Sequence, residues 1–498
     1  MRPGRTTAAR LLGSLAAVAI VAGAPAIASA HNLSTVYESP LPLAVYLVGA
    51  AMTVALSFMF VLARDMKAEL NPKTRIYRVP LAGRVVLRAI GLIGWAWILA
   101  QGIAGGSSDA AVATLFLWVY GWVAVAMLSA LVFPVWEWID PFATLHDILA
   151  WILRTIGVRG WAVTALPAGA RIWPAVAGLG FFIWVELVAI AGNGTLAVIL
   201  AGYTVLTLAL MAQFGRDEWR ASGETFTVWF RTLNRLAKFG VVPASRTGVP
   251  DNADAVDDTA VVGRPFASAL LDADWEIPRI VLVAFGTGSI LFDGLSQTVA
   301  FATIFGNPPL VMKTLLLFTF LGLIAGLALA VARAVSPGAM GAGLTPIAVG
   351  YLIAHYLTYV AIDGQRIVIA ISDPLQTGAD LFGTAFYVVN SGWLPPGLVW
   401  TLQLSAVVGG HILGAWAGHV RAQRDVAALA ATKPPRDRRH RKIPSTTSRR
   451  IPNVRRREIP LAFVMVFLTT LTLWSLGQSI VQQPAAQGRQ QVAAANPA

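Results

Sequence analysis

The chain has 498 residues, of which 56% are hydrophobic and only 13% charged, with a net charge of +13 and no cysteine. A soluble domain carries about 25% charged residues, so this composition excludes an ordinary soluble protein. The absence of cysteine excludes disulfides, thiolate metal sites and cysteine nucleophiles. The positive charge does not indicate a nucleic-acid partner, because the basic residues lie in the segments that connect long apolar runs.

Residues 1–30 have the pattern of a secretory signal peptide. Basic residues at the start precede an apolar run at 11–23, and the Ala-Ser-Ala triplet at 28–30 supplies a small-x-small cleavage site. Cleavage would make His31 the first mature residue and leave the N-terminus outside the cell. An uncleaved signal anchor is the alternative.

Ten apolar runs follow, each long enough to cross a bilayer as a helix of about twenty residues. They lie at about 41–63, 84–105, 111–133, 172–191, 195–214, 280–304, 310–332, 344–363, 397–419 and 460–481. The sequence therefore predicts an all-α integral membrane protein of about ten transmembrane helices. Residues 31–482 would form the ten-span domain, and residues 483–498 an external tail.

The basic residues favour this topology. With the mature N-terminus outside, 32 of the 35 Lys and Arg residues after residue 30 fall in inner segments. The positive-inside rule requires such a bias, and one span more or fewer would invert every later loop. We therefore predict a protein of the bacterial plasma membrane, embedded in the lipid bilayer, with both termini external.

Three inner segments have a distinct character. Residues 136–159 and 216–239 carry aromatic residues at helical spacing beside basic ones, which predicts helices lying on the membrane surface. The segment at about 421–458 is dense in arginine, proline and serine. We expect this segment to be a disordered cytoplasmic loop that attracts anionic lipids, with a plain topology signal as the alternative.

Small residues recur at a spacing of four in two of the runs, which puts each set on one helix face. The sets are Gly322, Gly326 and Ala330 in the seventh run, and Gly410, Gly414 and Gly418 in the ninth. Such faces permit helices to approach closely, so we predict helix packing at both.

Four ionisable residues fall inside four different runs and are the strongest candidates for chemistry: Glu186, Asp293, His355 and His411. Counting about 1.5 Å per residue from the inner helix ends places them within a band about 9 Å thick. Ionisable groups inside a bilayer are costly and mark functional sites, so we predict one connected polar centre. Two imidazoles and two carboxylates suit a divalent metal such as zinc, copper or iron. Haem ligation by the histidines and a proton relay are the alternatives.

Polar residues of the predicted outer loop form a second group: Asp363, Gln365, Asp373 and Asp380. The stretch Gly286-Thr-Gly-Ser289 interrupts the sixth run shortly before its aspartate, as in the discontinuous helices of transporters. The chain has no His-Glu-x-x-His, Gly-x-Ser-x-Gly or phosphate-loop motif. No familiar catalytic motif therefore names a reaction.

Several short motifs occur together in this chain. They are Trp184-Val-Glu-Leu-Val188, Gly223-Glu-Thr-Phe-Thr-Val-Trp-Phe230, Phe292-Asp-Gly-Leu-Ser296, His355-Tyr-Leu-Thr358, Asp363-Gly-Gln365, Ser372-Asp-Pro-Leu375, Asp380-Leu-Phe-Gly-Thr384 and Gly410-His411. Jointly they resemble a bacterial family of polytopic membrane proteins called fenitrothion hydrolase-like. The resemblance covers residues 30 to 480 and is strongest from 180 to 420. It implies hydrolysis of organophosphate-type esters, and it brings no assigned catalytic residues.

Three functions therefore stay open from the sequence. The first is a membrane-embedded hydrolase, with a divalent metal or, as a second choice, haem. The second is a transporter or proton-coupled carrier that uses the same four residues. The third is a structural or assembly protein in which those residues only pack.

Overall fold

The computed structural model describes residues 48–49, 52, 75–77, 79–105, 111–158, 164–243, 259–431 and 459–476. The predicted signal peptide, most of the first span, most of the basic loop and the C-terminal tail lie outside these residues. Within them, eight helical runs are long and apolar enough to cross a membrane, and a shorter apolar helix follows near the C-terminus. The described chain is that of a polytopic, α-helical membrane protein.

The apolar runs from residue 84 onward each contain one of these helices. The elements are α3 (Leu81–Ala104); α4, η1 and α5 (Val112–Thr114, Leu115–Ala124, Val125–Leu131); α8 and η3 (Trp173–Trp184, Val185–Ala189); α9 (Asn193–Phe214); α13 (Ile277–Ser296); α15 (Leu310–Ala334); α16, η5 and α17 (Pro337–Ile362, Asp363–Arg366, Ile367–Ser372); α18 (Pro396–Ala431); and α20 (Ile459–Leu476). The total of ten spans stays a prediction, because most of the run at 41–63 lies outside the described residues.

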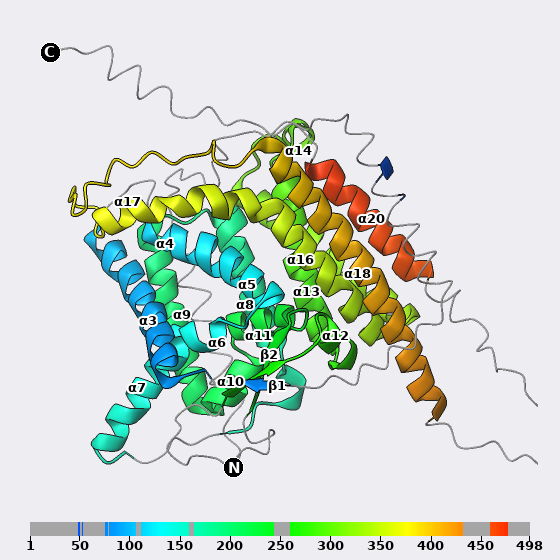
Figure 1. The fold of residues 1–498 in the computed structure, drawn as a ribbon, viewed down its shortest axis with the longest axis horizontal. Helices are drawn as coiled ribbons and strands as arrows, with labels where there is room; N and C mark the ends of the chain where they lie inside the picture. The colour runs from blue at the N-terminus through cyan, green and yellow to red at the C-terminus, as the bar shows by residue number, and fades with distance from the viewer. Residues whose placement is uncertain are drawn as a thin grey trace, which may run out of the picture.

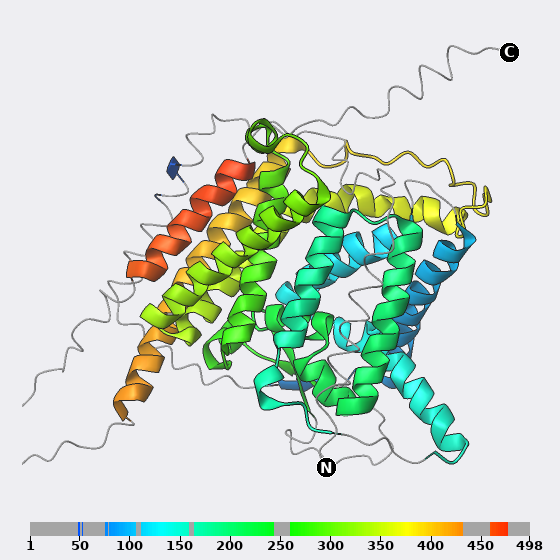
Figure 2. The same cartoon turned by 180° about the vertical axis from the view of Figure 1, so that it is seen from behind.

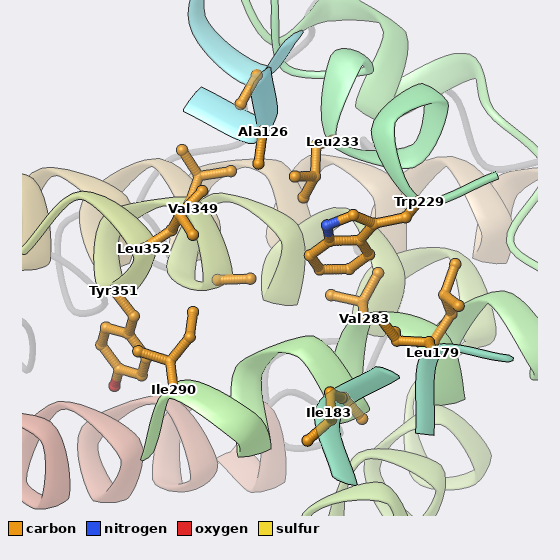
Figure 3. Close-up of a cluster of buried hydrophobic side chains, with 14 of the residues drawn as sticks. Ala126, Leu179, Ile183, Trp229, Leu233, Val283, Ile290, Val349, Tyr351 and Leu352 are labelled. Atoms are coloured by element: carbon orange, nitrogen blue, oxygen red, sulfur yellow. The ribbon is translucent and has the colours of Figure 1, made fainter. Parts of the chain in front are cut away.

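The helices form two sides that share one core. In Figures 1 and 2, α3, α4 and α9 lie on one side of the bundle, and α13, α16, α18 and α20 on the other. Apolar side chains from both sides belong to a single buried cluster. Figure 3 shows part of it, with Ile183 of α8, Val283 of α13 and Val349 of α16 pointing into the same region.

The connections between spans gather at two ends of the bundle. One end, here the sheet end, holds α6 (Trp136–Ile139), α7 (Pro141–Thr155), α10 (Arg216–Ser222), α12 (Ser268–Asp272) and a small sheet. The opposite end, here the loop end, holds α14 (Val299–Phe305), α17 and the loop 373–395. The sheet end carries segments predicted to be inner. The loop end carries the predicted outer loop with α17, and α14, which falls mostly within the predicted sixth span at 280–304. The alternation agrees with the predicted topology, whereas the side that faces the cytoplasm stays a prediction.

The sheet was not predicted. Its three antiparallel strands, β1 (Arg75–Tyr77), β2 (Phe239–Pro243) and β3 (Thr259–Gly263), are ordered β1-β3-β2. Val261 pairs with Tyr77 on one side and with Val241 on the other. Strands of three and five residues are too short to give a periodic pattern, so the sequence analysis missed them.

The prediction of a membrane-surface helix at 216–239 is wrong. The segment forms two helices, α10 and α11 (Thr225–Asn234), and their aromatic side chains enter the protein core. Trp229 is 2% exposed and stacks on Trp122 of η1, with 5.6 Å between ring centroids. Figure 3 shows its indole among side chains of α8 and α13. An amphipathic pattern identifies the apolar face of a helix, but that face can meet protein as well as lipid.

Two predicted boundaries are also wrong. α13 runs unbroken through Gly286–Ser289, and the interruption comes after it, at Gln297 and Thr298. α18 continues to Ala431, so the first eleven residues of the predicted disordered loop are helical. Arg421 and Asp425 form an ion pair one helical turn apart (2.8 Å) within this extension, and such pairs stabilise a helix.

Candidate functional site

Two of the predicted site residues meet directly between α13 and α16. Nε2 of His355 lies 2.9 Å from Oδ2 of Asp293. The aspartate side chain is 5% exposed and the histidine side chain 18%. Pairing a carboxylate with an imidazole offsets part of the desolvation cost that each would bear alone between membrane helices.

The carboxylate of Asp293 also receives hydrogen bonds from two further side chains. The hydroxyl of Tyr356 donates to Oδ2 (3.1 Å), and the amide of Gln297 donates to Oδ1 (2.7 Å). Gln297 lies four residues after Asp293 on the same helix face. His355 and Tyr356 are adjacent residues of α16, and both reach the same carboxylate. Their rings are nearly perpendicular, at 88°. We call these four residues the Asp293 site.

Glu186 adds a second carboxylate to the same region. Its side chain is buried and lies within electrostatic range of Asp293 and Tyr356. The residue is carried by η3, a π-helical turn that ends at Ala189 and is followed by Ile190 with φ of 46°. This left-handed backbone is strained for a β-branched residue. π-Helical turns occur frequently at functional sites, which agrees with a role for this glutamate.

His411 belongs to a different pair. Its Nδ1 lies 2.8 Å from the carbonyl oxygen of Val407, and its Nε2 lies 3.2 Å from the hydroxyl of Tyr351. A carbonyl only accepts, so Nδ1 carries the proton and Nε2 accepts from the tyrosine. The ring is fully buried, and its contacts join α18 to α16. Neither hydrogen bond links His411 to Asp293, His355 or Glu186, so the predicted single centre of four residues stays a prediction.

The described residues do not form the predicted metal centre. Among them, no group of three or more His, Asp or Glu side chains is arranged to hold a metal ion. Asp293 and His355 supply two potential ligands, but His411 uses both ring nitrogens elsewhere. The same engagement argues against haem ligation by the two histidines together.

Two residues of the outer-loop motif shape the loop itself. The carboxylate of Asp373 accepts hydrogen bonds from the backbone N–H groups of Thr377 and Gly378, both at 2.9 Å. Asp380 accepts from the hydroxyl of Ser372 at 2.7 Å, and this hydrogen bond lowers the pKa of the aspartate. Both carboxylates therefore act locally, by ordering the chain that follows α17.

The other two residues of the motif hold the end of α16. Asp363 pairs with Arg366 at 3.1 Å, three residues along the chain. Gln365 donates to the carbonyl of Asn390 and accepts from the hydroxyl of Tyr387, both at 2.9 Å. These contacts tie the returning loop to η5.

A buried charge network at the sheet end was missed by the sequence analysis. Arg220 of α10 donates to Asp140 (3.0 Å) and to Glu137 (3.1 Å), and Arg231 of α11 donates to the same glutamate (2.8 Å). Burial alone would raise the pKa of Glu137, but the two arginines lower it to about 2. The partners lie 80 to 94 residues apart, so no local sequence motif predicts these pairs.

A second buried carboxylate holds the start of α11. Glu224 accepts hydrogen bonds from the backbone N–H groups of Phe226 (3.1 Å) and Thr227 (2.6 Å), and thus caps the helix. The hydroxyl of Tyr203 donates to the same side chain at 2.6 Å. Burial, assisted by the charge of Asp140, raises the pKa of Glu224. These contacts anchor α11 within the bundle.

No protein-family model, curated protein or solved structure matches this chain. The resemblance to fenitrothion hydrolase-like proteins therefore stays a proposal that rests on the sequence motifs. The candidate site rests on its own geometry.

Proposed function

We propose that this membrane protein is a proton-coupled carrier and that the Asp293 site is its proton-binding site. The observation that carries the proposal is the direct pair of Asp293 and His355, buried between two membrane helices. A carboxylate and an imidazole in hydrogen-bond contact can exchange a proton without the movement of either helix. Ionisable residues that face the interior of a helix bundle commonly serve as proton relays.

The surroundings of the pair suit this role. The imidazole of His355 is the more exposed member, so it is the group through which a proton reaches the carboxylate. Glu186 and Tyr356 lie within electrostatic range and can continue the relay. Two carboxylates close together in a low dielectric hold a proton more firmly than one alone.

The site also has a route to conformational change. Gln297, which donates to Asp293, is the residue at which α13 ends before α14 begins. Protonation of the carboxylate weakens its charge-assisted hydrogen bonds. In the proposed carrier, proton binding therefore loosens the join between these helices, and proton release tightens it again.

A membrane-embedded hydrolase is the second candidate, and the same pair favours it. A carboxylate that orients an imidazole is the arrangement of a general base, in which the histidine takes a proton from water or a hydroxyl group. The motif resemblance would then give an organophosphate-type ester as substrate. In this version His355 activates the nucleophile, and Asp293 keeps the ring in place.

The test compares proton flux and ester turnover in one set of proteins. Wild type, Asp293→Asn and His355→Gln are reconstituted in liposomes loaded with a pH-sensitive dye, under an imposed membrane potential. Matched controls are Asp217→Asn, whose side chain is 85% exposed, and His146→Gln, at the sheet end. The carrier proposal predicts that both site variants lose at least about tenfold of the proton flux, whereas the controls keep it.

Hydrolysis is measured on the same preparations by release of the nitrophenol product from fenitrothion. Turnover that depends on His355, without proton flux, identifies the hydrolase. Proton flux that is equal in wild type and both site variants overturns the carrier. If neither activity depends on the pair, the Asp293 site has a structural role.

A further inference from the structure

Three arginines converge at the sheet end, away from the Asp293 site. Arg235 directly follows α11, Arg264 directly follows β3, and Arg279 lies in the first turn of α13. All three side chains are half-buried. Arg264 and Arg279 both lie within electrostatic range of Arg235. Three different elements thus bring three guanidinium groups into one region.

The hydrogen bonds of these arginines go to uncharged groups. Arg235 donates to the backbone carbonyl of Asp274 (2.9 Å), Arg264 to that of Ala237 (3.1 Å), and Arg279 to the hydroxyl of Thr232 (2.7 Å). Nε of Arg279 is buried and has no hydrogen-bond partner among the described residues. Within the described chain, none of the three has a carboxylate oxygen within 4.0 Å.

Other arginines at the same end are neutralised by carboxylates. The pairs are Arg88 and Arg216 with Asp147, Arg220 with Glu137 and Asp140, Arg421 with Asp425, and Arg424 with Asp272. A cation taken out of water without a counter-charge is costly. The three converging arginines therefore have N–H donors and positive charges without a counter-ion. An anion from outside the described chain would accept hydrogen bonds from these donors and neutralise the charges.

We propose that Arg235, Arg264 and Arg279 form a binding site for a phosphate group, carried by an anionic phospholipid or by a soluble phosphate. Guanidinium groups match the geometry of phosphate oxygens and bind them through paired N–H donors. The N-terminus of α13, a helix of 20 residues, adds the positive end of the helix dipole.

The electrostatics of the region agree with this assignment. Burial, followed by the neighbouring Arg279, lowers the pKa of Arg235, and burial lowers that of Arg264 to about 10. Asp274 and Glu276 are the nearby acidic residues; both are exposed and act only at longer range. A bound phosphate would remove the repulsion between the guanidinium groups.

Apolar side chains beside the arginines favour a lipid as the source of the phosphate. Phe266 lies two residues after Arg264 and is 47% exposed, and Ile277 lies two residues before Arg279 and is 39% exposed. Exposed apolar groups next to cations fit a surface at the level of lipid headgroups. The ring of Trp275 lies 4.6 Å below the guanidinium of Arg235 and orients it.

The experiment measures thermal unfolding of the purified full chain in neutral detergent, at constant ionic strength. Phosphatidylglycerol, phosphatidylcholine and inorganic phosphate are titrated separately. Anything that binds the folded state raises the melting temperature. We expect phosphatidylglycerol to raise it and phosphatidylcholine not to. A response to inorganic phosphate alone would assign the site to a soluble anion.

Variants locate the response on the chain. Arg235→Gln, Arg264→Gln and Arg279→Gln are each expected to raise the half-saturating concentration about tenfold, the effect of losing one charge-assisted contact. Arg279→Lys keeps the charge and the fold but loses the paired donors, so it should show a smaller rise. Arg424→Gln, at an exposed ion pair of the same end, should leave the titration unchanged.

Three outcomes overturn the site. The first is a wild-type protein that responds to none of the titrants. The second is a triple Arg→Gln variant that folds and keeps the wild-type response, which would place lipid binding on the basic segment 433–457. The third is a phosphate response that appears only when the four aspartates of 251–258 are replaced by asparagine, because those carboxylates would then be the internal partners of the arginines.

Discussion

Tyr351 and His411 face each other between α16 and α18, with 3.2 Å between the phenol oxygen and Nε2 of the imidazole. Four residues further along α16, His355 turns to a third helix and pairs with Asp293 of α13. Polar side chains of α16 therefore contact two neighbouring helices, α18 and α13. The two histidines belong to separate hydrogen-bonded pairs.

The pair of Asp293 and His355 predicts a non-additive mutant cycle. Asp293→Asn and His355→Gln should each lower the free energy of unfolding, because each leaves a buried partner without its counterpart. The double variant should lose less than the sum of the single losses, by about 1–3 kcal/mol. Unfolding in mixed detergent micelles gives the loss of unfolding free energy for the two single variants and the double variant. Additive losses would mean that the two side chains do not interact.

The separation of the histidines predicts the opposite for a second cycle. His355→Gln and His411→Gln have no hydrogen bond or shared partner in common among the described residues. Their losses of unfolding free energy should add to within about 0.5 kcal/mol. A clear shortfall in the double variant would restore the single connected centre expected from the sequence.

The two small-residue faces should respond differently to added methyl groups. A Cβ at Gly410 would lie 2.7 Å from the carbonyl oxygen of Pro346, whereas a Cβ at Gly322 meets nothing within 4 Å among the described residues. Gly410→Ala should therefore cost about 1–3 kcal/mol of unfolding free energy. Gly322→Ala should be neutral or stabilise the helix by up to about 1 kcal/mol. Equal losses at both positions would contradict the observed packing of α18 on α16.

The buried network at the sheet end predicts loss of stability in acid. The arginines lower the pKa of Glu137 from 4.5 to about 2 in the folded protein. Its contribution is therefore present above pH 4.5 and is lost as the pH falls toward 2. That contribution is on the order of 3 kcal/mol. The stability difference between wild type and Glu137→Gln should shrink over this range, and a difference that is constant with pH would rule out the pairing.

The absence of native cysteine permits a direct test of sidedness. Thr377→Cys places a thiol on the exposed part of the loop end, and Asp217→Cys places one on the exposed surface of the sheet end. A membrane-impermeant maleimide added to intact cells should label the first variant only. Labelling of Asp217→Cys alone would reverse the predicted orientation.

The sequence by itself determined where the membrane helices lie. A bilayer sets both the length and the composition of a spanning helix, so apolar runs of about twenty residues are visible without knowledge of their neighbours. The packing face of Gly410, Gly414 and Gly418 was visible for a similar reason: a spacing of four residues belongs to one helix. The trio at Gly322 has the same spacing, but among the described residues a Cβ at Gly322 or Gly326 would meet nothing within 4 Å, and Ala330 is exposed.

Only the tertiary structure decided what each polar or amphipathic face meets. Periodicity shows that Trp229 lies on the apolar side of its helix, but not that this side enters the core beside Trp122. Depth along a helix placed His355 and His411 at similar levels, but the lateral order and rotation of the helices gave them different partners. The lateral order of the helices depends on contacts between residues far apart in the chain. The hydrophobic periodicity of a single segment does not show which other segment it contacts.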